Sequence, residues 1–181
     1  MEYRNTSLPS WLPDSQILEK YLKMVKIDFA RSSIIPSNFK IVFATIFSVV
    51  LSLAADMACV SVGEKIFPST VGFVHFRFSD YAALTVIGVL GACAGWYVLL
   101  QISSKPKWIF FRSAILLTFV LYVPDLWIWL KGEPIKAVSV LMVMHLLIAV
   151  ITYNSMVRFA PAREAYKYAS AKLEQGVTLD S

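Results

Sequence analysis

Charged residues are scarce in this sequence. Of its 181 residues only 16% are Asp, Glu, Lys or Arg, whereas 57% are hydrophobic, and the mean hydropathy is +0.63. A soluble domain of this length carries about 25% charged residues, so the composition argues against a water-soluble fold. The apolar residues gather in four long runs, and a lipid bilayer is the solvent in which such runs are stable.

Cysteine and histidine are scarcer still. The chain has two cysteines, Cys59 and Cys93, and two histidines, and no CxxC pair or Cys/His spacing is typical of a zinc site. The cysteines fall at depths that differ by roughly 10 Å, so no disulfide between them is expected.

The sequence also lacks a nucleophile motif, a phosphate loop and a dinucleotide-binding fingerprint. We therefore expect no metal and no cofactor, and a binding or structural module is favoured over an enzyme.

Four apolar runs have the length of about 20 residues that a hydrocarbon core requires. They cover residues 39–62, 81–102, 108–130 and 135–159. The sequence therefore predicts an all-α fold, a four-helix transmembrane bundle in residues 39–159. We expect a cytoplasmic tail and basic helix in residues 1–38, and a cytoplasmic C-terminal tail in residues 160–181.

Positive residues flank the predicted spans unevenly. Thirteen of the 17 Lys and Arg residues lie in the N-terminal segment up to residue 40, around the second loop, or after residue 157. The first and third loops hold the other four, which are Lys65, Arg77, Lys131 and Lys136. Because cytoplasmic loops carry an excess of Lys and Arg, we predict that both termini are cytoplasmic. Short basic flanks of this kind do not form the stripe that a nucleic-acid partner needs.

The segment from Asp14 to Arg31 is predicted to form a basic amphipathic helix. Its apolar side chains gather on one broad face, and its lysines fill the other. Such a helix is expected to lie on the anionic headgroups of the cytoplasmic leaflet. The alternative is that its apolar face packs on a partner subunit or on the bundle.

Away from the basic residues near the span ends, three ionisable residues fall inside the predicted spans, namely Asp56, Asp125 and His145. Placing an ionisable side chain in the hydrocarbon core costs free energy, so each of these residues is expected to have a structural or functional role there. Asp56 ends a row of small residues at four-residue spacing, which are Ala44, Ser48 and Ser52. Rows of this kind mark the side of a span that packs against other helices. We predict that the three ionisable groups converge in one interior cluster that opens to the outer side.

Three further side chains belong to the candidate ligand-binding site. Tyr122 shares a helix face with Asp125, while Arg77 and Asp80 lie in the outer loop, where they are placed to cap the mouth of a pocket. The favoured interpretation of that loop is simpler, with Ser79 or Asp80 as the N-cap of the next helix. Pro124 directly precedes Asp125 and is expected to kink the third span and free a backbone carbonyl.

The second span carries two further signals. Gly91 and Gly95 form a GxxxG spacing, and with Gly88 and Ala92 they predict a surface of close contact, inside the bundle or in a dimer. Interfacial aromatic residues are expected near the span ends; these are Tyr81, Trp96, Tyr97, Trp108, Trp127 and Trp129.

Residues from about Lys40 to Arg158 resemble a family of uncharacterised bacterial four-span membrane proteins, often met in actinobacteria. Three motifs carry the resemblance, namely Phe78-Ser79-Asp80-Tyr81, Pro124-Asp125-Leu126 and Leu141-Met142-Val143-Met144-His145. The resemblance implies a plasma-membrane location and the same polar cluster, but no activity.

The sequence leaves three functions open. In the first, the protein is a small membrane module or subunit, with a homo-oligomer or a larger membrane complex as its possible setting, and the polar cluster is architectural. In the second, Asp56, Asp125 and His145 bind or transform a small or lipidic molecule. In the third, an oligomer passes protons or cations, but no span has a polar stripe through both leaflets.

Overall fold

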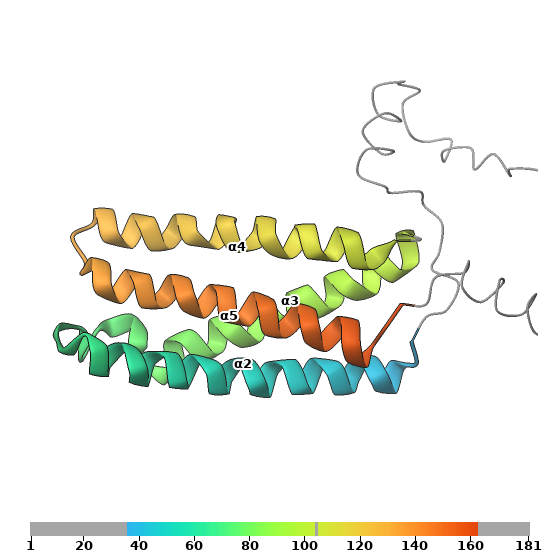
Figure 1. The fold of residues 1–181 in the computed structure, drawn as a ribbon, viewed down its shortest axis with the longest axis horizontal. Helices are drawn as coiled ribbons and strands as arrows, with labels where there is room; N and C mark the ends of the chain where they lie inside the picture. The colour runs from blue at the N-terminus through green and yellow to red at the C-terminus, as the bar shows by residue number, and fades with distance from the viewer. Residues whose placement is uncertain (1–35, 104, 163–181) are drawn as a thin grey trace, which may run out of the picture.

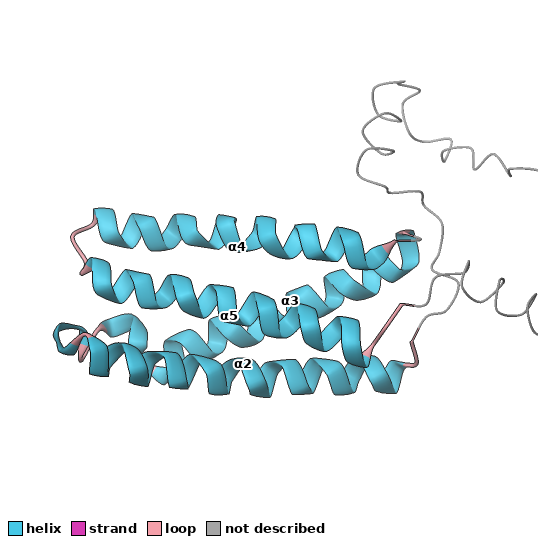
Figure 2. Cartoon of the chain, viewed as in Figure 1, coloured by secondary structure: helices cyan, strands magenta, loops and turns pink. Residues whose placement is uncertain are grey.

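Four long α-helices form the part of the chain that the computed structural model describes, residues 36–103 and 105–162. They are α2 (Asn38–Ile66), α3 (Phe78–Ile102), α4 (Pro106–Leu130) and α5 (Ile135–Phe159). The loop between α2 and α3 contains two short 3-10 helices, η1 (Pro68–Thr70) and η2 (Val74–Phe76). Figure 2 shows no strand in the described residues. The amphipathic helix predicted for residues 14–31 lies outside them.

Each of the four helices is long and apolar enough to cross a membrane. At 1.5 Å per residue, 25 to 29 residues extend roughly 37–44 Å, which exceeds a hydrocarbon core of about 30 Å. The helices contain the four predicted spans. The prediction of an all-α, four-helix transmembrane bundle is thus confirmed, and the chain is a multi-pass membrane protein.

Helix α5 is the centre of the arrangement. It lies between α2 and α4, while α3 crosses obliquely behind it from the side of α2 to the side of α4 (Figure 1). We call the end with residues 67–77 and 131–134 the long-loop end. The end where α3 passes into α4 through residues 103–105 is the short-loop end.

Two apolar clusters lie toward the two ends of the bundle. The short-loop cluster is built around Trp96, Leu100, Phe110 and Met156, and the long-loop cluster contains Val60, Phe76, Tyr81, Val140, Leu141 and Met144. Along the buried face of α2, the order is Ala44, Ser48, Ser52, Asp56 and Val60. The buried polar groups of α2 therefore lie between the two apolar clusters, on the interior face that their four-residue spacing predicts.

Gly132 and Gly63 illustrate two different reasons for a glycine, a left-handed backbone and a close approach of two helices. Gly132, in the turn between α4 and α5, has φ +99°, a left-handed conformation that other residues rarely adopt. Gly63 lets α2 approach α5 at the long-loop end, because an added Cβ would lie 2.8 Å from Cγ2 of Val140.

The glycines of α3 do not contact the bundle, so the prediction that they pack inside it is wrong, while Ala92 does pack on the short-loop cluster and the alternative of a dimer stays a prediction. Gly88, Gly91 and Gly95 are exposed, and a Cβ added at any of them would meet nothing within 4 Å. The buried face of α3 instead carries larger residues, which are Tyr81, Thr85, Val89, Cys93, Trp96 and Leu100. These place the glycines on the opposite side of the helix. For the same reason Trp96, expected at the lipid interface, is fully buried.

Candidate functional site

Asp56 is a fully buried carboxylate that connects α2 to α3. Its Oδ2 accepts a hydrogen bond from Oγ1 of Thr85, with 2.7 Å between the oxygens. Its Oδ1 has no hydrogen-bond partner among the described residues, and neither has Oγ of Ser52, one turn earlier on the same buried face. A buried polar atom without a partner costs about 1–3 kcal/mol, so this part of the interior is polar and only partly satisfied.

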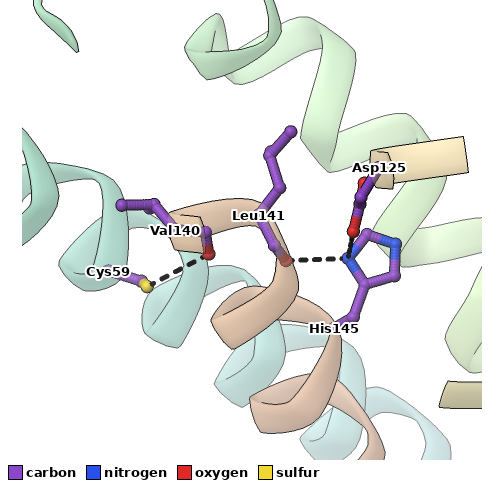
Figure 3. Close-up of polar contacts among 5 residues, drawn as sticks. All are labelled: Cys59, Asp125, Val140, Leu141 and His145. Atoms are coloured by element: carbon purple, nitrogen blue, oxygen red, sulfur yellow. Dashed lines mark hydrogen bonds and ion pairs between the residues drawn. The ribbon is translucent and has the colours of Figure 1, made fainter. Parts of the chain in front are cut away.

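Asp125 and His145 form a polar contact between α4 and α5. Nδ1 of His145 lies 2.8 Å from the carbonyl oxygen of Leu141 and 3.7 Å from Oδ2 of Asp125 (Figure 3). Because a carbonyl only accepts hydrogen bonds, Nδ1 carries a hydrogen and donates it to Leu141. The longer distance to Asp125 exceeds that of a hydrogen bond. The pair is therefore an electrostatic contact and not a hydrogen bond.

The three predicted residues lie in one electrostatic neighbourhood but make two separate contacts. His145 interacts electrostatically with both aspartates, and His75 from the long loop also acts on Asp125. Exposure rises across the group, from 0% for Asp56 to 6% for the Asp125 side chain and 24% for that of His145. Asp56 thus belongs to the closed interior, whereas His145 reaches the surface of the bundle.

The two candidates near the start of α3, Arg77 and Asp80, take no part in these contacts. Helix α3 begins at Phe78 with Arg77 in the capping position and no side-chain cap. The prediction that Ser79 or Asp80 caps this helix is therefore wrong, because both lie inside its first turn. Ser79 donates a hydrogen bond to Asp80, which is exposed and lies where the helix dipole favours a negative charge. Arg77 is also exposed.

The two remaining features predicted near Asp125 are on α4. Tyr122 is half-buried, and its ring meets the edge of Phe119 with 6.0 Å between centroids. Pro124 is exposed, and α4 continues through it as one helix (Figure 1). The proline lacks an N–H, so the carbonyl of Val120 does not receive the usual helical hydrogen bond from this position.

Several residues that connect helices are not evident from the sequence alone. Thr85 is the partner of Asp56, Oγ of Ser48 donates to Oγ1 of Thr152 at 3.2 Å, and the indole of Trp96 donates to the carbonyl of Ala160 at 3.1 Å. Cys59 also places its Sγ 3.9 Å from the carbonyl oxygen of Val140 (Figure 3). Thr85 has one signal in the sequence, its four-residue spacing from Tyr81 and Val89.

Within residues 36–103 and 105–162, no group of three or more His, Cys, Asp and Glu side chains is arranged to hold a metal ion. Comparison with protein families, curated proteins and solved structures gives no match to the chain. The resemblance to four-span bacterial proteins therefore stays a prediction, and the function has to be inferred from the geometry.

Proposed function

We propose that the protein is a small membrane module or subunit whose interior polar groups hold its four helices in one arrangement. The observation that carries this proposal is a set of three polar contacts between side chains, each between a different pair of helices. Asp56–Thr85 connects α2 to α3, Ser48–Thr152 connects α2 to α5, and Asp125–His145 connects α4 to α5. Together they join all four helices.

Such contacts matter in a bilayer because apolar helices gain little by leaving lipid for protein. Interhelical polar contacts contribute about 0.6–2 kcal/mol each in membranes. They also fix which residues face each other, since a sliding helix would leave a carboxylate or hydroxyl unpaired. The proposed role of the polar groups is therefore to specify the packing of the module.

The test replaces Asp125 by Asn and by Leu. An amide still interacts with His145, so we expect Asp125→Asn to unfold close to the parent protein. Leu removes the polar contact between α4 and α5, and we expect it to lower the free energy of unfolding by about 1–2 kcal/mol. Val123→Leu, at an exposed position of the same helix, is the control. A fully stable Asp125→Leu protein would refute the architectural role.

A second candidate function is the binding of a small or lipidic molecule at the Asp125–His145 pair. Two observations favour it. The His145 side chain is 24% exposed, and Oδ2 of Asp125 has no hydrogen-bond partner among the described residues. Native mass spectrometry of the purified protein distinguishes this candidate. A ligand mass present on the parent and lost from a stable Asp125→Asn protein would support binding over architecture.

Passage of protons or cations ranks third. The buried hydroxyls of Ser48, Ser52 and Thr152 are flanked at both ends by the apolar clusters. A proton flux measured in liposomes and abolished by Asp56→Asn would favour this function over the other two.

We also propose that the short-loop end faces the cytoplasm of a bacterial plasma membrane. The support is the excess of Lys and Arg at that end and in both tails. A membrane-impermeant maleimide applied to intact cells should label Ser69→Cys and leave Ser170→Cys untouched, with the parent as the background for the native cysteines. Labelling of Ser170→Cys alone would reverse the orientation.

A further inference from the structure

A cavity of about 310 Å³ lies at the short-loop end, away from the polar contacts of the interior. It is lined by Lys105, Pro106, Lys107 and Trp108 at the start of α4 and by Ala162 after α5. This volume is at the lower end of the range found for pockets that bind small molecules. It accommodates a compact polar group better than a large ligand.

The charge around this cavity is positive and has no acidic counterpart among the described residues. Lys105 and Lys107 are exposed on either side of Pro106, and the guanidinium of Arg112 lies 3.7 Å above the ring of Trp108. The described acidic residues are all in the interior or at the long-loop end, and they are Asp56, Glu64, Asp80, Asp125 and Glu133. An anion is therefore the ligand that the cavity suits.

The start of α4 adds to this preference. The N-terminal end of a helix carries partial positive charge, which favours an anion near the first turn of α4. A tryptophan beside basic residues is typical of the depth at which lipid headgroups lie. Trp108 therefore places the cavity near the phosphate layer of the bilayer.

An apolar track leads from the cavity toward the middle of the membrane. Phe111 and Ile115 follow Lys107 at four-residue intervals on one face of α4 and are 50% and 44% exposed. A lipid with its phosphate at Lys107 would lay an acyl chain along this face. A free inorganic anion would use the lysines alone.

We infer that this cavity binds the headgroup of an anionic phospholipid, with Lys105 and Lys107 contacting the phosphate and Phe111 and Ile115 packing on an acyl chain. The inference depends on insertion of the protein into a membrane. It does not depend on the role of the interior polar contacts, so either idea can fail alone.

The test is a titration of the full-length protein in neutral detergent with phosphatidylglycerol, followed by native mass spectrometry. Each lysine near an anionic lipid is worth roughly fivefold in affinity, so the K105A/K107A protein should bind on the order of 25-fold more weakly. The matched control is K131A/K136A at the long-loop end, where Lys131 lies 5.4 Å above the ring of Trp127. This control should bind as the parent does, and phosphatidylcholine should bind neither protein tightly.

Three outcomes would overturn the inference. An unchanged affinity in K105A/K107A would show that the cavity is not the site, for instance because acidic residues of this chain occupy it. An equal loss in K131A/K136A would show that total charge alone attracts the lipid. Inorganic phosphate that competes fully with the lipid, together with an unaffected Phe111→Ala protein, would show a free-anion site.

Discussion

The hydrogen bond between Asp56 and Thr85 connects α2 to α3, and its contribution to the free energy of unfolding can be measured directly. The two residues are 0% and 3% exposed, and 2.7 Å separates the hydroxyl from the carboxylate oxygen. A double-mutant cycle of Asp56→Val, Thr85→Val and the pair isolates their interaction from other effects of each change. Interhelical contacts in membranes average about 0.6 kcal/mol and reach about 1.7 kcal/mol. We expect a coupling of about 1 kcal/mol, which is above this average because the contact is short and buried.

Asp56→Asn sharpens this prediction. The amide oxygen can still accept the hydrogen bond from Thr85. The amide nitrogen takes the place of Oδ1, which has no partner among the described residues, and an uncharged amide costs less to bury than a carboxylate. We therefore expect the Asn protein to be as stable as the parent or up to about 1 kcal/mol more stable.

The assay is equilibrium unfolding in mixed micelles, followed by far-UV circular dichroism and by the fluorescence of the five tryptophans. Val variants whose effects simply add would show that the Asp56–Thr85 contact contributes nothing to holding the helices. An Asn protein destabilised as much as the Val protein would show that the carboxylate itself is needed. That result would show that the charge of Asp56, and not its hydrogen bond with Thr85 alone, stabilises this part of the interior.

The same unfolding assay checks two further predictions. Gly63→Ala should lower the free energy of unfolding by about 1–3 kcal/mol, because the new Cβ would lie 2.8 Å from Val140. Gly91→Ala is the control, and it should be neutral or slightly stabilising because its Cβ meets open space. Equal effects of the two changes would contradict the packing of α2 on α5. Trp96→Phe should cost about 1–3 kcal/mol, since it leaves the carbonyl after α5 without its 3.1 Å hydrogen bond, and a neutral result would refute that contact.

The positions of the spans are predictable because length and hydropathy determine which segments can cross a bilayer. Helix α2 continues past residue 62, the predicted end of the first span, and reaches Ile66. Hydropathy falls at Gly63, Glu64 and Lys65, but these residues stay helical, and Gly63 lies against Val140 of α5. The interior face of α2 is also predictable, since small and polar residues at four-residue spacing have no reason to face lipid.

The interior face of α3 is not predictable in the same way. Both of its faces are apolar, and either face could contact lipid at little cost in free energy. Hydropathy therefore does not show whether the glycines or Trp96 face the bundle. The pairing of Asp56 with Thr85 depends on which helix lies beside α2 and on the relative depth of the two helices. The sequence of a single helix gives neither its neighbour nor its depth relative to that neighbour. The convergence of Asp125 and His145 is expected from their helix faces, and the structure places them 3.7 Å apart.

Helix α4 is the element that this bundle holds least firmly. Only 11% of its apolar stretch is buried, against 22–33% in the other three helices. It is attached near the long-loop end by Asp125 and His145, and at the short-loop end by Phe110, which contacts Trp96 and Tyr153 with ring centroids 5.0 and 5.8 Å apart. Because apolar side chains gain little by moving from lipid to protein, these two attachments decide whether α4 stays on α5. Loss of the polar attachment should therefore release the long-loop half of α4 while the aromatic attachment keeps the other half in place.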